Sequence, residues 1–271
     1  MHCGLHTPSP RVLKGRGSGE EQPPTRIFQD FQLNIHAQAT GLITVRLDVA
    51  PEHEAEFNDW YRLEHVPQLT ALPGFVRTRR YFCSSADIRY LAWYETADET
   101  VEAAADFQHI VAHPTPWSQR MRTLYGNKRE RMNFKLMCEV GNTVGRTDCS
   151  DAPWMYIVHT DIPDHIVDEY NAWYDSEHLP RCAGIPGVLR ARRYASTGIP
   201  GGATDGPKYL TAYEMTGPDV WESPAALQAR RTPWTEKMRS LFSNTRRALY
   251  QLVAPTLSHT QALGLPRIYV K

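Results

Sequence analysis

The sequence contains one long pattern twice, without a gap, 113 positions apart. Residues 57–81 read FNDWYRLEHVPQLTALPGFVRTRRY, and residues 170–194 read YNAWYDSEHLPRCAGIPGVLRARRY. Both copies keep the Trp-Tyr pair, the Glu-His pair, the Pro-Gly turn and the final Arg-Arg-Tyr. A fixed internal repeat constrains the architecture more than any other sequence feature. Because a unit of roughly 100 residues is too long for a solenoid repeat, the sequence predicts a domain duplicated in tandem.

Composition argues against several classes of partner. The 271 residues include 30 Lys and Arg against 30 Asp and Glu, so no net charge directs the chain to nucleic acid or to an anionic membrane. No apolar run reaches the roughly 20 residues that a membrane-spanning helix needs. The five cysteines never form a CxxC pair, which favours reduced thiols over a disulfide framework. The N-terminus lacks the apolar core of a secretory signal, so we expect a cytoplasmic protein.

The distribution of apolar residues divides the chain into five segments. Residues 1–40 are rich in Pro, Gly and Ser without periodicity, which predicts a disordered leader. The two repeats cover residues 41–140 and 154–254, with a linker at 141–153 between them. Residues 255–271 are expected to form a C-terminal tail.

Each repeat shows the same order of strands and helices. An alternating apolar run is followed by a helix with the Trp-Tyr and Glu-His pairs, two more alternating strands, a helix interrupted by a Thr-Pro pair, and a last strand. The predicted strands are 41–49, 75–83, 88–95 and 131–140, and then 155–162, 188–195, 208–215 and 246–254. This β-α-β-β-α-β order is that of a ferredoxin-like unit. Because helices cover only one face of such a sheet, we predict an α+β fold in which two ferredoxin-like βαββαβ repeats pack sheet to sheet.

The pattern W-Y-x-x-E-H-[VL]-P, followed by Pro-Gly and an Arg-Tyr strand, resembles the EthD-type families of the dimeric α/β-barrel superfamily. The resemblance covers residues 41–140 and 154–254 and implies a fused dimeric α/β barrel. Relatives in the superfamily include cofactor-independent monooxygenases, polyketide cyclases, lactone isomerases, decarboxylases and haem proteins, so the fold alone does not select a reaction. The resemblance also implies that the histidine of the Glu-His pair transfers protons.

The candidate catalytic residues are the two Glu-His pairs, namely His65, His178, Glu64 and Glu177. An imidazole beside a carboxylate is suited to move protons near neutral pH. Aromatic side chains nearby could stack on a planar substrate, and Arg and Tyr could stabilise an oxyanion. The candidate substrate-binding residues are Asn58, Trp60, Tyr61, Arg80 and Tyr81 in the first copy, and Asn171, Trp173, Tyr174, Arg193 and Tyr194 in the second. Strand alternation places Arg80 and Tyr81 on opposite faces of the sheet, and the sequence leaves open which face lines the pocket.

A structural role would explain the same residues. The Trp and Tyr side chains could be ordinary core, and each histidine could bond to the backbone of the Pro-Gly turn.

The arginines in two basic clusters fit a solvated face or an anion site better than a nucleic-acid surface. These clusters are Arg120, Arg122, Arg129 and Arg131 in the first copy, and Arg239, Arg246 and Arg247 in the second.

Neither a metal nor a haem site is expected. His109 and His113 are four positions apart, but the corresponding residues of the second copy are Ala226 and Arg230. A haem would need an axial histidine, and nothing in the sequence selects one among His65, His159 and His178. We therefore expect no metal and no cofactor.

The two copies differ beside the motif. Asp59 corresponds to Ala172, and Arg62 corresponds to Asp175. The richer charge pattern of the first copy favours it as the active one.

We expect an EthD-like cofactor-independent enzyme that uses histidine general acid–base chemistry on a small aromatic or polyketide-like carbonyl compound. Decarboxylation, isomerisation, cyclisation and oxygenation all remain open, so the enzyme would be a lyase, an isomerase or a cofactor-free monooxygenase. The alternatives are a non-catalytic small-molecule-binding or stress-type barrel and a haem-binding relative. The expected partner is the small-molecule substrate, without nucleic acid or membrane, in a monomer or a homodimer.

Overall fold

The computed structural model describes residues 39–125, 128–141, 152–198 and 206–265. Most of the expected leader and linker therefore lies outside the described residues. The described parts of both repeats belong to one compact unit within residues 31–271. Among the described residues, no helix is long and apolar enough to cross a membrane.

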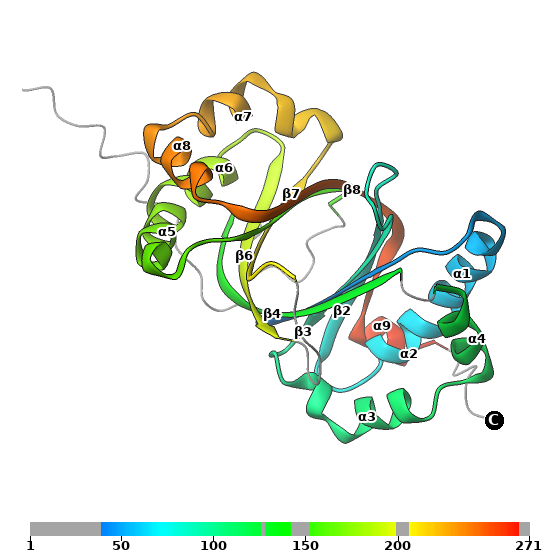
Figure 1. The fold of residues 1–271 in the computed structure, drawn as a ribbon. Helices are drawn as coiled ribbons and strands as arrows, with labels where there is room; N and C mark the ends of the chain where they lie inside the picture. Colours follow the sequence, from blue (N-terminus) through cyan, green and yellow to red (C-terminus); the bar gives the residue numbers. More distant parts are fainter. Residues whose placement is uncertain (1–38, 126–127, 142–151, 199–205, 266–271) are drawn as a thin grey trace, which may run out of the picture. The chain divides into compact units, whose positions relative to one another are not determined.

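Eight antiparallel strands among the described residues close a barrel in the order β1-β3-β2-β8-β5-β7-β6-β4 (Figure 1). The first half supplies β1 (Gly41–Leu47), β2 (Phe75–Phe82), β3 (Tyr90–Thr96) and β4 (Arg129–Gly141). The second half supplies β5 (Trp154–Asp161), β6 (Val188–Gly198), β7 (Tyr209–Met215) and β8 (Ser243–Ser258). The predicted α+β class and barrel are confirmed.

Two long strands join the halves. β4 pairs first with β1 of its own half and then with β6 of the other half. β8 pairs first with β5 and then with β2. The sequence predicted two sheets packed against each other, whereas the structure shows one sheet closed by backbone hydrogen bonds at both junctions. Closure leaves none of the eight described strands with an unpaired edge, which would otherwise be a site of aggregation.

Helices form a layer on the outside of the barrel (Figure 1). Those of the first half are η1 (Pro51–His53), α1 (Glu54–Trp60), η2 (Tyr61–His65), α2 (Val66–Thr70), η3 (Val101–Ala103), α3 (Ala105–Ala112) and α4 (Pro116–Tyr125). Those of the second half are η4 (Asp164–Ile166), α5 (Val167–Trp173), η5 (Tyr174–His178), α6 (Leu179–Ala183), η6 (Pro218–Glu222), α7 (Pro224–Ala229) and α8 (Pro233–Ser240), and α9 (His259–Leu263) follows β8. The predicted helix restarts are confirmed, because Thr115 and Thr232 accept backbone N–H bonds from Ser118 and Thr235 at 3.0 Å.

The segment after Pro255 differs from the expected tail. β8 continues to Ser258, and α9 begins there with a capping box between Ser258 and Gln261. His259 Nδ1 lies 2.8 Å from the Thr70 carbonyl of α2. A proline inside a strand suggested that the strand ends, since it cannot donate a ladder hydrogen bond. Here Pro255 falls at an irregularity in the pairing of β8 with β2, where a donor is not required.

The two Pro-Gly turns precede β2 and β6 and lie against η3 and η6. Gly74 and Gly187 have φ values of 87° and 93°, which favour glycine. A Cβ atom would lie 2.7 Å from Val101 at Gly74 and 2.6 Å from Val220 at Gly187. The turn therefore needs glycine for both conformation and space, and Val101 and Val220 occupy equivalent positions in the two halves.

Side chains from both halves fill the barrel interior. The apolar part includes Tyr81, Trp93, Phe134, Met155, Ile157, Tyr194, Leu210 and Tyr250, all of them buried. Two further apolar clusters lie under the helices of the second and the first half. Because the interior is packed, the cavities of this fold lie outside the barrel wall or at its ends.

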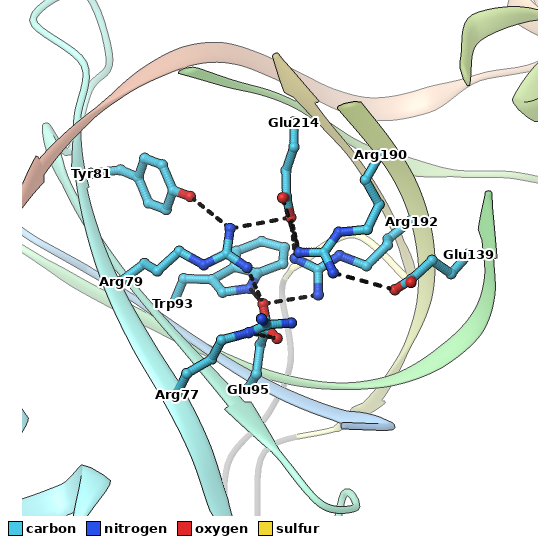
Figure 2. A network of polar contacts seen from close by, with 9 residues as sticks. All are labelled: Arg77, Arg79, Tyr81, Trp93, Glu95, Glu139, Arg190, Arg192 and Glu214. Atoms are coloured by element: carbon cyan, nitrogen blue, oxygen red, sulfur yellow. Dashed lines mark hydrogen bonds and ion pairs between the residues drawn. The ribbon is translucent and has the colours of Figure 1, made fainter. Parts of the chain in front are cut away.

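A buried network of arginine and glutamate crosses the interior (Figure 2). Arg79 Nη2 lies 2.6 Å from Glu95 of its own half, and Arg79 Nη1 lies 3.2 Å from Glu214 of the other half. Arg192 pairs with Glu214 of its own half and lies 2.9 Å from Glu95. The same arginines hold the pKa of both carboxyl groups below the usual range, although burial acts in the opposite direction.

Three more charged residues extend this network. Arg77 lies 2.5 Å from Glu95, and Arg190 lies 2.8 Å from Glu214. Glu139 Oε2 is 3.8 Å from Arg190. The charges of this interior network are thus paired with one another, in part across the junction of the halves, which is the condition under which buried ions are tolerated.

Candidate active site

The Glu-His pair of each copy lies in a π-helical turn, at η2 in the first half and η5 in the second. An α-helix turns by roughly 100° per residue, so residues five apart point in different directions. The π turn aligns them instead, and such turns are frequent at functional sites. The His65 ring consequently stacks on the Trp60 ring, with centroids 4.3 Å apart and planes 20° apart. His178 stacks on Trp173 in the same way, at 4.3 Å and 22°.

A cavity of about 450 Å³ lies beside His65, between β1 and the helices of the first half. Its walls are mainly apolar and include Ile43, Val45, Phe75 and Phe107. Polar groups interrupt this surface, among them His65, Tyr61, Tyr94, Arg122, Arg129 and Arg131. A largely apolar cavity of this size with a few polar groups is typical of small-molecule sites.

Electrostatics keep the His65 imidazole neutral. Burial, and after it the positive charges of Arg122, Arg80, Arg129 and Arg131, lower the pKa of His65 to about 3. Burial also raises the pKa of Tyr61 and Tyr94, so both phenols keep their protons. The first-half cavity therefore offers an unprotonated imidazole and neutral O–H donors at neutral pH.

Positive charge gathers around the same cavity. Arg131 pairs with Glu102 behind the wall. Arg122 and Arg129 are exposed, and within the described part of the chain neither pairs with a carboxylate. Tyr94 Oη is buried without a hydrogen-bond partner among the described residues. Unpaired cations and an unused donor favour an anion, or an oxygen on which negative charge develops.

The carboxylate of Glu64 is bound to a residue of α1 and to the start of α4. It accepts hydrogen bonds from Trp60 at 3.1 Å, Ser118 at 2.8 Å and Thr115 at 2.5 Å. In the second half Glu177 accepts one from Thr232 at 2.6 Å. Thr115 directly precedes α4, and Thr232 directly precedes α8. Each glutamate therefore links its π turn to the start of that helix. These hydrogen bonds join Glu64 to Trp60 and to the start of α4, and Glu177 to the residue before α8.

The arginine and tyrosine at the end of β2 face opposite sides of the barrel wall. The Arg80 guanidinium lies on the helix side, 4.0 Å from the centroid of Tyr61. Tyr81 lies in the interior, and its hydroxyl accepts a hydrogen bond from Arg79 at 3.2 Å. Tyr194 is likewise buried in the interior. The structure therefore brings Trp60, Tyr61 and His65 together and separates Tyr81 and Tyr194 from the histidines.

The remaining candidates form pairs beside the π turns. Asn58 donates to the Tyr90 hydroxyl at 3.1 Å. Asn171 accepts from Arg193 at 2.6 Å, and Arg193 stacks over Tyr174 with its centre 4.3 Å from the ring. These contacts fix the turn against β3 in the first half and against β6 in the second.

The second half has a smaller cavity, about 250 Å³, beside His178. Burial and then the surrounding arginines lower the pKa of His178 to about 3. Tyr156 is the counterpart of Ile43 in the first half. Trp221 is the counterpart of Glu102, because each residue follows the valine that lies against the Pro-Gly turn of its half. The Tyr156 and Trp221 rings stack with centroids 4.6 Å apart and line this cavity. Two aromatic rings thus occupy space that stays open in the first half.

One site residue was missed from the sequence, although a signal for it exists. Residues 90–95 read YLAWYE and residues 209–214 read YLTAYE, a second pattern present in both halves. Its second tyrosine, Tyr94 or Tyr213, faces the helix-side cavity. Its glutamate, Glu95 or Glu214, faces the interior network.

Metal ligands do not cluster in the described part of the chain, where no three His, Cys, Asp or Glu side chains are placed to hold one ion. His109 and His113 stack at 4.4 Å on the exposed side of α3. His113 Nδ1 lies 3.0 Å from the His109 carbonyl.

Comparison with known proteins identifies the fold. No family model matches the chain, and no curated protein matches it in sequence. An anthrone oxidase-like protein matches in structure with a TM-score of 0.58 at 13% identity, over 83% of this chain and 94% of that chain. A protein from Fusobacterium nucleatum that carries a monooxygenase name matches with a TM-score of 0.55 at 8% identity, over 82% of this chain and 96% of its own. Another protein with a monooxygenase name, from Lactobacillus acidophilus, matches with a TM-score of 0.53 at 9% identity, over 81% of this chain and 97% of its own. These likenesses show an α/β barrel with eight antiparallel strands.

Proposed function

We propose that this chain is an enzyme, a cofactor-independent oxygenase whose active site is the cavity beside His65. We further infer that its halves are two fused ferredoxin-like units and that it is an EthD-type member of the dimeric α/β-barrel superfamily. The observation that carries the proposal is the combination, in one apolar cavity, of a neutral imidazole, an unpartnered phenol and unpaired guanidinium groups. The oxidase-like and monooxygenase names of the structural neighbours favour oxygenation over isomerisation or decarboxylation.

The substrate class is a planar aromatic ketone with an acidic methylene group, as in an anthrone. Loss of one methylene proton gives an enolate, which can transfer an electron to dioxygen without a metal or flavin. Recombination of the two radicals forms a carbon–oxygen bond to a peroxide. Protonation and loss of water then leave a second carbonyl, so the methylene group and dioxygen give a ketone and one water.

His65 is the proposed base. It is unprotonated at neutral pH, and stacking on Trp60 holds its ring at the cavity wall. A low pKa makes it a weak base, so the substrate anion must be stabilised as it forms. Tyr94 would donate a hydrogen bond to the enolate oxygen, and Arg122 and Arg129 would supply positive charge. The guanidinium groups that disfavour an imidazolium therefore favour the enolate.

The first half is proposed as the active one. Its cavity is about 450 Å³, against about 250 Å³ in the second half, where Tyr156 and Trp221 stack. The second half would then contribute the rest of the barrel and its own packed histidine. This assignment agrees with the expectation from the charge pattern around Asp59 and Arg62.

Turnover of anthrone by the full chain tests the proposal. The assay measures dioxygen uptake and anthraquinone formation at slightly acidic pH, where uncatalysed autoxidation is slow and can be subtracted. We expect one dioxygen consumed per anthrone, at a rate that a metal chelator does not change. A Soret band in the purified protein, or loss of turnover with the chelator, would exclude the cofactor-independent reaction. No acceleration over autoxidation would remove this substrate class.

A further inference from the structure

A third cavity, of about 590 Å³, lies where the two halves meet on the helix side of β2. Its walls come from the π turn and α2, from β2, and from the end of β8 with α9. They are mostly apolar and include Val66, Pro67, Leu257 and Leu265. This junction cavity is separate from the first-half cavity, and Tyr61 lines both.

One buried cation lines the junction cavity. Arg80 is 6% exposed and stacks over Tyr61, but within the described residues no carboxylate pairs with it. Its Nη2 atom is buried without a hydrogen-bond partner. A buried guanidinium that lacks a counter-ion is costly and is normally completed by an anion.

In the second half, a carboxylate pairs with the arginine that corresponds to Arg80. Arg193 corresponds to Arg80 and stacks over Tyr174 at 4.3 Å. Its guanidinium lies 3.2 Å from the Asp175 carboxylate. In the first half Arg62 replaces this aspartate, so the carboxylate is lost and a second cation lines the cavity instead. The Asp175 carboxylate thus marks the kind of group that the Arg80 site lacks.

We propose that the junction cavity binds an amphipathic monocarboxylate, with the carboxylate on Arg80 and the apolar body along α2, β8 and α9. The exposed Arg62 at the rim adds positive charge at the cavity entrance, although it also pairs with Asp59 at 3.0 Å. Leu257 and Leu265 supply apolar surface in the same cavity. This site is independent of the proposed oxygenase reaction.

Calorimetric titration with octanoate and 1-octanol tests the site, because the two share a chain length and differ in charge. The titration uses an Ile43→Tyr background, in which the first-half cavity is filled as in the second half. We expect octanoate to bind with a stoichiometry of one and octanol to bind at least tenfold more weakly. Equal affinity for the two probes would overturn recognition of the carboxylate. Loss of octanoate binding on introducing Ile43→Tyr would place the ligand in the first-half cavity and also overturn the proposal.

A double substitution at exposed positions supplies the sharpest variant. Asp59→Ala with Arg62→Asp copies the second half and gives Arg80 an internal carboxylate, so octanoate affinity should fall at least tenfold while thermal stability is kept. Arg80→Gln should lose binding to a similar extent, and Arg193→Gln, its counterpart in the second half, should leave binding unchanged. Unaltered octanoate binding in the double variant, or equal losses in Arg80→Gln and Arg193→Gln, would contradict the assignment. Activity on anthrone is measured separately, so failure of that reaction leaves this result interpretable.

Discussion

The Arg79 guanidinium of the first half lies 3.2 Å from the Glu214 carboxylate of the second half, inside the barrel. The reciprocal pair, Arg192 with Glu95, is separated by 2.9 Å (Figure 2). All four side chains are at most 3% exposed. Each glutamate therefore depends on an arginine from the other half, which links the stability of one repeat to the presence of its partner.

Removing one member of this network should destabilise the whole barrel. Arg79→Met leaves the buried carboxylates of Glu95 and Glu214 short of a positive charge, so we expect a loss of roughly 3–5 kcal/mol in the free energy of unfolding. Denaturant titration measures this value. Arg62→Met, at an exposed position, serves as the control and should change stability by less than about 1 kcal/mol. A loss for Arg79→Met as small as that of the control would show that the network is not stabilising.

Filling the first-half cavity should abolish its ligand binding. Ile43→Tyr introduces the ring that Tyr156 supplies in the second half, and we expect at least a tenfold loss of anthrone affinity by fluorescence titration. The matched change, Tyr156→Ile, opens the second-half cavity and should leave anthrone binding at the first site intact. If Ile43→Tyr bound anthrone as well as the unmodified chain, the ligand would have to lie elsewhere.

Acid should destabilise the protein through its buried histidines. The pKa of His178 is about 3 in the folded chain, against 6.5 for an ordinary histidine. Between these values the unfolded state binds a proton that the folded state does not, so stability rises with pH through this window and levels off above it. The expected slope is up to about 1.4 kcal/mol per pH unit for each such histidine. His178→Phe should reduce the slope measured by denaturant titration between pH 4 and 6, and an unchanged slope would contradict the buried neutral imidazole.

The threonine before α4 should stabilise the π turn as well as the helix. Thr115→Val removes both the cap to the Ser118 N–H and the hydrogen bond to Glu64, at an expected cost of about 1–2 kcal/mol. Thr232→Val removes the corresponding pair in the second half and should cost a similar amount. In a double-mutant cycle, Thr115→Val and Glu64→Gln should be non-additive. Additive losses would show that the two side chains act independently.

Local features of this fold were predictable, since they depend on residues close in sequence. Strand alternation, the Thr-Pro restarts before α4 and α8, and the Pro-Gly turns each carry their own signal. The strand pairs that close the barrel, β4 with β6 and β8 with β2, were not predictable, because they join residues from different halves. The same long-range geometry decided that Arg80 faces the helices and Tyr81 the interior, a choice that alternation alone leaves open.

Parts of the candidate site were hidden for a similar reason. The sequence indicated an aromatic and imidazole cluster, and Trp60, Tyr61 and His65 do meet. It did not indicate the π turn, which stacks residues five apart and turns Glu64 toward α4. Nor could the sizes of the two cavities be read from the repeat, because they depend on how Tyr156 and Trp221 stack.

Dioxygen uptake by two matched variants tests the central claim, that the reaction takes place beside the first histidine. His65→Phe and His178→Phe each keep a ring stacked on tryptophan while removing the imidazole. In the assay with anthrone, we expect His65→Phe to lose about 10²–10⁴-fold in rate, the range of general base catalysis, and His178→Phe to keep the rate of the unmodified chain. A folded His65→Phe variant with full activity, or a loss confined to His178→Phe, would contradict the account.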